Sequence, residues 1–150
     1  MTPAEALARH AFHRRLTLDL LRDLPGKALS YSPNKGQGPF WKQFRHVGRV
    51  QEDYLTALSA RKMRFSAEAG TYRAGNSKLG LLSYLRRLDS RLVAAVKTAR
   101  RPVDWWGEKV PPAEHLLRLS EHEVLHHGQW LVYLNGLKLK PPKSWHVWGY

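Results

Sequence analysis

The chain has 150 residues, which is enough for one domain with a hydrophobic core of its own. Apolar residues make up 43 % of it and cysteine is absent, which argues against a disordered chain and excludes disulfides, thiolate metal sites and cysteine nucleophiles. The formal net charge of +13 fits either a polyanion partner such as nucleic acid or a solvated cationic surface.

The N-terminal segment indicates where the protein is found. Residues 1–15 carry charges throughout and contain no apolar stretch of the kind found in secretory signals. The longest apolar runs, such as residues 130–134, are far too short to cross a bilayer. We therefore expect a cytoplasmic protein.

The first half of the chain predicts two helices. The first runs from Thr2 to about Asp23, and its start is marked by a capping box that Thr2 forms with Glu5. A loop rich in Ser, Pro, Asn and Gly follows. The second helix is predicted from near Pro39 to about Lys62, with apolar residues at helical spacing.

The second half predicts two more helices and no strand. The third runs from Ser77 to about Arg100 and has the clearest apolar stripe. The fourth runs from about Ala113 to Leu134, and Asn135-Gly136 is expected to cap it. The aromatic tail, residues 137–150, is expected to fold back onto the helices. Residues 1–150 therefore predict one all-α domain, a four-helix bundle whose long connections permit crossovers.

The fourth helix carries the most informative pattern. His122 and His126 lie one turn apart on one face, where two imidazoles can bind a single metal ion. His127 points about 100° away and is not expected to share that ion. On a helical wheel the pair lies among residues expected to face the core, namely Leu119, Leu125, Val132 and Tyr133. With eight histidines in the chain, a chance pair is the competing interpretation.

A third ligand has to come from another element. His46 is the first candidate, because it lies within helix two beside the apolar stripe. His115 competes, although it is two turns, about 10 Å, from His122. Weaker options are His10, His13 and His146.

Other residues near the pair have two interpretations each. Gln129 and Tyr133 share the face of the histidines and either line a binding pocket or pack in the core. Glu121 and Glu123 point away from the ligands and are expected to support them from behind or to lie on the surface. Trp105, Trp106 and Glu108 either form a lid over the pocket or belong to the core.

Two segments resemble a known family. Residues 122–129, His-Glu-Val-Leu-His-His-Gly-Gln, resemble the closing motif of the DinB/YfiT-like family of DNA-damage-inducible proteins, which is His-Glu-x-x-His followed by x-Gly-Gln. Residues 40–55, with His46 inside them, resemble the helix-two block of that family. Many members have Arg at the position of His127 and another His at the position of Leu125. The resemblance covers nearly the whole chain.

The resemblance implies a four-helix bundle in which His46, His122 and His126 bind one divalent metal ion, Zn²⁺ or Ni²⁺. Three protein ligands leave positions open for water or substrate, as in catalytic sites. Some members are similar to thiol S-transferases that use low-molecular-weight thiols such as bacillithiol or mycothiol, and many members are homodimers.

We therefore expect a metal-dependent thiol S-transferase or hydrolase that acts on a small molecule in stress or detoxification chemistry. The alternative is a basic nucleic-acid-binding protein, or a helical protein without activity whose metal is structural. No helix-turn-helix, zinc-finger or RNP sequence supports the nucleic-acid alternative, so a solvated cationic surface is favoured.

Overall fold

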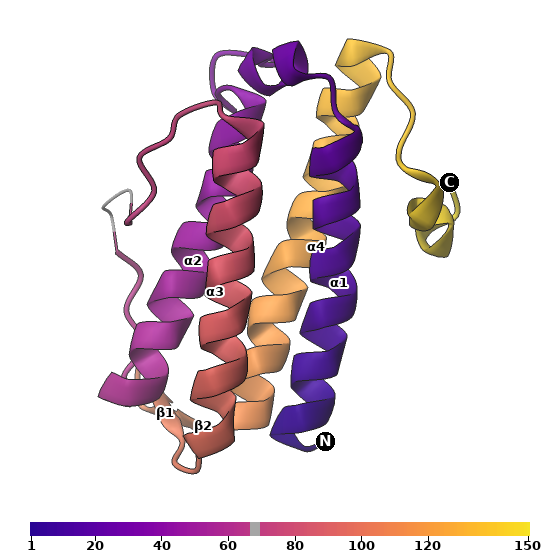
Figure 1. Ribbon diagram of the computed structural model, residues 1–150. Coiled ribbons are helices and arrows are strands. Elements are labelled where there is room, and N and C mark those ends of the chain that lie inside the picture. The colour runs from indigo at the N-terminus through magenta and orange to yellow at the C-terminus, as the bar shows by residue number, and fades with distance from the viewer. Residues whose placement is uncertain (67–69) are drawn as a thin grey trace.

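Four long helices pack as a bundle in the computed structural model, which describes residues 1–66 and 70–150 (Figure 1). They are α1 (Pro3–Asp23), α2 (Phe40–Ala60), α3 (Lys78–Thr98) and α4 (Pro112–Leu137). Two short 3₁₀ helices, η1 (Gly26–Ser30) and η2 (Lys143–Trp148), follow α1 and α4 respectively. The predicted all-α four-helix bundle is confirmed.

The helix directions require a crossover. α1 and α4 run one way, while α2 and α3 run the other way (Figure 1). Since α2 and α3 are parallel, the chain between them has to return along the length of the bundle. The crossover expected from the long connections is therefore present, and it lies between α2 and α3.

The ends of the helices follow local sequence signals in part. At the start of α1 the predicted capping box is present, because the Thr2 hydroxyl accepts from the Glu5 amide and the Glu5 carboxylate accepts from the Thr2 amide. The expected end of α4 was wrong. The helix continues through Asn135 and Gly136, and it is capped by Lys138 in the left-handed conformation at φ 56°.

A small β-hairpin was missed. β1 (Val103–Trp105) pairs antiparallel with β2 (Glu108–Val110), and Val103 and Val110 lie opposite each other and are fully buried. Trp106 and Gly107 form the two-residue turn, both with positive φ. Strands of three residues are too short to show alternation, and Trp-Gly is a weaker turn signal than Asn-Gly.

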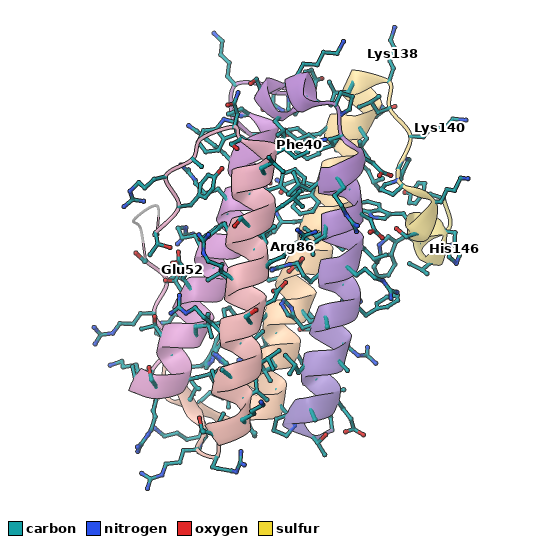
Figure 2. The ribbon with its side chains drawn as sticks, viewed as in Figure 1. Phe40, Glu52, Arg86, Lys138, Lys140 and His146 are labelled. Atoms are coloured by element: carbon teal, nitrogen blue, oxygen red, sulfur yellow. The ribbon has the colours of Figure 1, made fainter. Side chains whose placement is uncertain are left out.

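The tail folds back, as expected. Trp145 in η2 is fully buried, and its indole N–H donates to the Leu16 carbonyl oxygen of α1 at 3.0 Å. Figure 2 shows Phe40 inside the bundle and Lys138 and Lys140 extending outward from the chain after α4. No helix among the described residues is long and apolar enough to span a membrane.

Two buried histidines other than the candidate ligands His46, His122 and His126 make stability depend on pH. His10 and His115 are almost fully buried, and burial lowers the pKa of each to about 4. In the unfolded chain each imidazole takes up a proton near pH 6.5. Stability is therefore complete above pH 6.5 and is lost as the pH falls towards 4.

The free energy of unfolding of the parent falls between pH 6.5 and 4. We expect this fall to be smaller in His10→Leu by about 1.4 kcal/mol per pH unit, because residue 10 no longer takes up a proton when the chain unfolds. At pH 7 the variant should be at least as stable as the parent, because neither nitrogen of His10 has a hydrogen-bond partner among the described residues. Urea unfolding of chelator-treated protein between pH 4.5 and 7 measures both effects. His146→Gln, at an exposed position, is the control and should keep the parent's pH dependence.

Candidate metal centre

Three histidines meet between α2 and α4, which lie next to each other and run in opposite directions. His46 comes from α2, and His122 and His126 come from successive turns of α4. Each offers one ring nitrogen, and these atoms all lie within 4.8 Å of one another. The three residues proposed from spacing and resemblance therefore form a cluster that could hold a metal ion.

The spacing of the α4 pair fits one ion. The Nε2 atoms of His122 and His126 are 3.2 Å apart. Two nitrogens bound at about 2.0–2.1 Å to one tetrahedral ion lie roughly 3.3 Å from each other. The centre of the His46 ring is 4.8 Å from that of His126 and 5.2 Å from that of His122, and one His46 ring nitrogen lies within 4.8 Å of the nitrogens that the other two rings offer.

Gln129 orients one of the three candidate ligands. Its Oε1 lies 2.9 Å from Nδ1 of His126, and an amide oxygen can only accept a hydrogen bond. The hydrogen of His126 is thereby placed on Nδ1, and the lone pair is left on Nε2, which faces His122. Gln129 was expected either to line a binding pocket or to pack in the core, and the structure places its amide oxygen against the ring of His126. An outer hydrogen bond of this kind is typical of histidines that bind metals.

Arg49 makes the environment of His46 different. Its guanidinium lies 3.3 Å from Nδ1 of His46 and pairs with Asp53 at 3.2 Å. Guanidinium can only donate, so Nδ1 is the acceptor and the hydrogen of the neutral ring is on Nε2. Coordination through Nε2 therefore requires the ring to change tautomer and Arg49 to move away from Nδ1.

The histidines of the cluster are held in the neutral form that binds metals. Burial, and next the neighbouring His126, lower the pKa of His46 to about 4. The same two causes, with His46 added, lower the pKa of His122 to about 3. Because a ligand nitrogen must be unprotonated, little competition from protons is expected at neutral pH.

The cluster lies at the edge of the core rather than inside it. All three histidines are only half-buried, and Leu125 and Val132, which were expected to face the core, are 73 % and 50 % exposed. The buried side of α4 carries Glu123 and His127 instead. α4 is apolar around most of its circumference, so a helical wheel does not show which of its faces is buried. The expectation that Leu125 and Val132 face the core was wrong for this reason.

Directly behind the cluster is a buried charge network that the sequence did not reveal. Arg14 of α1 donates to both carboxylate oxygens of Glu123 at 2.8 Å, and to Asp89 of α3 at 2.6 Å and Gln51 of α2 at 2.7 Å. Arg14 and Glu123 are 2 % and 1 % exposed. Burial alone would raise the pKa of Glu123, but the charge of Arg14 holds it well below its usual value.

Two further residues have other partners. His127 is buried, and its Nε2 lies 2.8 Å from the Thr17 hydroxyl, so it turns away from the cluster as predicted. Tyr133 is fully buried and donates to the carbonyl oxygens of Gln37 and Gly38, which places it in the core.

The competing ligand His115 is fully satisfied elsewhere. Its Nδ1 accepts from the Trp105 indole at 3.1 Å, and its Nε2–H donates to the Tyr54 carbonyl oxygen at 3.0 Å. Trp105 therefore packs against a core histidine. Trp106 is 71 % exposed.

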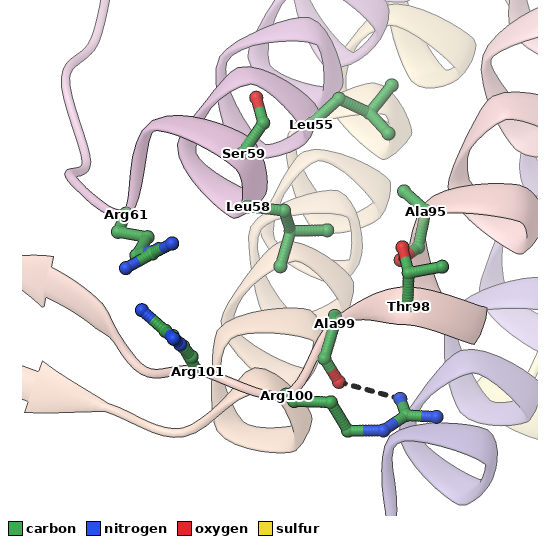
Figure 3. Close-up of a pocket in the computed structure, with 9 residues that line it drawn as sticks. All are labelled: Leu55, Leu58, Ser59, Arg61, Ala95, Thr98, Ala99, Arg100 and Arg101. Atoms are coloured by element: carbon green, nitrogen blue, oxygen red, sulfur yellow. Dashed lines mark hydrogen bonds between the residues drawn. The ribbon is translucent and has the colours of Figure 1, made fainter.

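A hollow of about 350 Å³ lies at the end of the bundle where α2 and α3 terminate, and it contains none of the three histidines. Figure 3 shows the guanidinium groups of Arg61 and Arg101 facing each other, with Arg100 bonded to the Ala99 carbonyl oxygen. Two helix C-termini carry partial negative charge there, so cationic side chains are favoured. These arginines therefore have a structural explanation.

A bundle with one crossover and a histidine cluster between α2 and α4 defines a class of helical proteins with a possible three-histidine metal site. The model of the DinB superfamily, DinB_2, matches residues 9–130, and the chain belongs to this family.

Two solved structures share the fold. A DinB-like protein from Bacillus cereus is 20 % identical with a TM-score of 0.72, and the match covers 91 % of this chain and 93 % of that one. A DinB-like protein from Bacillus subtilis is 17 % identical with a TM-score of 0.69, over 92 % and 94 % of the two chains. No curated protein matches the sequence.

Proposed function

We propose that this protein is a metal-dependent enzyme in which His46, His122 and His126 hold one Zn²⁺ or Ni²⁺ ion and a small-molecule thiol is the co-substrate. The observation that carries the proposal is the pair of Nε2 atoms 3.2 Å apart, with a ring nitrogen of His46 within 4.8 Å of the nitrogens that the pair offers. Such an ion lowers the pKa of a bound thiol or water and so supplies a nucleophile for S-transfer or hydrolysis.

The charge beside the cluster favours an anionic co-substrate. Arg45 and Arg49 flank His46 on α2, and Arg45 lies 5.1 Å from the centre of the Trp41 ring. Arg49 is paired with Asp53, whereas Arg45 has no carboxylate partner among the described residues. A half-buried guanidinium fixed over an aromatic ring is well suited to bind a carboxylate. This supports a low-molecular-weight thiol that carries carboxylates.

The test is conjugation of a thiol to an aryl halide by metal-loaded protein. We expect turnover that disappears after chelation, with a lower KM for mercaptosuccinate than for neutral 2-mercaptoethanol. Arg45→Gln should raise the KM for mercaptosuccinate about tenfold, the cost of one charged hydrogen bond, and leave that for 2-mercaptoethanol unchanged.

Arg91→Gln, on the exposed side of α3, is the matched control and should behave like the parent. Hydrolysis of a nitrophenyl ester without any thiol would favour the hydrolase instead. If the metal-loaded protein is no faster than the chelated one with either substrate, the enzyme proposal fails.

The nucleic-acid alternative rests on α3. Arg86, Arg87 and Arg91 are exposed and have no carboxylate partner among the described residues. This function would be favoured if the protein binds DNA and the logarithm of the binding constant falls steeply and linearly with the logarithm of the salt concentration. DNA binding that is weak even at low salt and is unchanged in Arg86→Gln would exclude the nucleic-acid alternative.

A further inference from the structure

Arg49 of α2 is held on several sides beside the candidate metal centre. It pairs with Asp53, one turn further along α2, at 3.2 Å, and both side chains are half-buried. The guanidinium also donates to the carbonyl oxygen of Ser66, and the amide of Ser66 donates to Asp53 at 3.1 Å. Gly70 covers the stem of the side chain, since a Cβ built there would lie 3.3 Å from Cγ of Arg49. Arg49 therefore has a fixed position rather than being a freely moving surface cation.

The second terminal nitrogen of this guanidinium is bonded to His46. Nη2 of Arg49 lies 3.3 Å from Nδ1 of His46, whereas Nη1 makes the contacts described above. Because guanidinium can only donate, the lone pair of Nδ1 accepts this hydrogen bond. His126 has the opposite arrangement, since its Nδ1 donates to the amide oxygen of Gln129. One candidate ligand thus has an acceptor beside Nδ1, as metal-binding histidines usually do, and another has a donor.

The Arg49–His46 hydrogen bond is lost whichever nitrogen of His46 binds an ion. An ion on Nδ1 needs the lone pair that Arg49 uses. An ion on Nε2 requires the ring hydrogen to be on Nδ1, where it would face an N–H of Arg49, and two donors repel each other. Turning the ring over also takes Nδ1 away from the guanidinium. Metal binding and this hydrogen bond therefore exclude each other.

We propose that Arg49 is a positioning residue that competes with the metal ion for His46. In the metal-free protein Arg49 occupies the lone pair of Nδ1, and an ion binds only by displacing it. The apparent affinity for metal falls with the fraction of protein in which His46 is free to bind, so the site fills only at a higher concentration of free metal. This inference rests on the proposed metal site and concerns its regulation.

The positive charge of Arg49 also repels a cation, so the variant has to leave the local charge unchanged. Arg49→Met/Asp53→Asn removes one cation and one anion together, and the new amide oxygen at position 53 can still accept from the Ser66 amide. We expect this double variant to bind Zn²⁺ about tenfold more tightly than the parent, the effect of removing one hydrogen bond to a charged group. Competition with a chelator dye measures both affinities.

Two further variants separate the hydrogen bond from other causes. Asp53→Asn alone keeps the bond to His46 and should bind Zn²⁺ no more tightly than the parent. Arg22→Met/Asp19→Asn removes an ion pair of the same kind from α1, and as the matched control it should keep the parent's affinity. The proposal is overturned if Arg49→Met/Asp53→Asn binds no more tightly than the parent, or if the α1 control gains as much.

Crystal structures of the parent with and without Zn²⁺ would show the displacement directly. We expect Nη2 of Arg49 to lie within hydrogen-bond distance of Nδ1 of His46 in the metal-free protein alone. A Zn²⁺-bound structure in which this bond persists would contradict the proposal, and so would a metal-free structure that lacks it. If Arg49 served only to hold Asp53 and Ser66, its contact with His46 would not depend on the metal.

These results are separate from those of the thiol-transfer assay. Tighter Zn²⁺ binding by Arg49→Met/Asp53→Asn without any turnover would support the role of Arg49 and reject the enzyme. Turnover by a parent whose Zn²⁺ affinity equals that of the double variant would do the reverse. If neither protein binds Zn²⁺, the metal site itself is absent and both proposals are wrong.

Discussion

Replacing His126 by alanine is expected to reduce the metal retained by the purified protein from about one equivalent to a small residue. His126 is the candidate ligand whose Nε2 lies 3.2 Å from that of His122 and whose ring Gln129 holds in place. Removing only an outer hydrogen bond costs roughly 10–100-fold in metal affinity, so loss of a ligand should cost more than about 100-fold. Elemental analysis and competition with a chelator dye measure both quantities.

The other histidines provide the controls. His122→Ala and His46→Ala should lose the metal in the same way, whereas the exposed His146→Ala should retain it. His127→Ala should also retain metal, although it should be less stable, because His127 is buried and bonded to Thr17. Metal loss with His127→Ala equal to that with His126→Ala would refute the assignment of ligands.

The site could be predicted from the sequence because its main signals are local. Two histidines four residues apart lie on one helix face wherever the helix packs, so His122 and His126 needed no tertiary information. His46 is different. Its place beside the apolar stripe of helix two made it the first candidate but left it in competition with His115, and the family resemblance then favoured His46. The structure explains the choice, since His115 is bonded to Tyr54 and Trp105 in the core.

The features that were missed depend on packing between helices. Arg14 follows His10 by one turn and precedes Thr17 by another, so it lies on the buried side of α1. An arginine is nevertheless expected to be exposed to solvent when its partners are not known from the sequence. Those partners come from α2, α3 and α4, between 37 and 109 residues away. In the same way, Leu125 and Val132 are apolar but exposed, because α4 turns its polar residues Glu123 and His127 inward.

The buried pair of Arg14 and Glu123 leads to the second large effect. Arg14→Met is expected to lower the free energy of unfolding by about 3–5 kcal/mol, because the Glu123 carboxylate is left buried without its counter-ion. Urea unfolding at pH 7 gives this value. Arg118→Met, which removes two ion pairs at the protein surface, is the matched control and should cost no more than about 1 kcal/mol.

The dependence of this loss on pH separates charge from packing. Without Arg14, burial raises the pKa of Glu123, so the folded variant can accept a proton there as the pH falls. The parent keeps Glu123 ionised, and the difference in stability between parent and variant should therefore shrink from pH 7 to pH 5. Arg14→Met/Glu123→Leu, which removes both charges, should be more stable at pH 7 than Arg14→Met alone, since no unpaired ion remains from this pair. A difference that is constant with pH, together with no recovery in the double variant, would show that Arg14 stabilises the bundle through the packing of its side chain rather than through its charge.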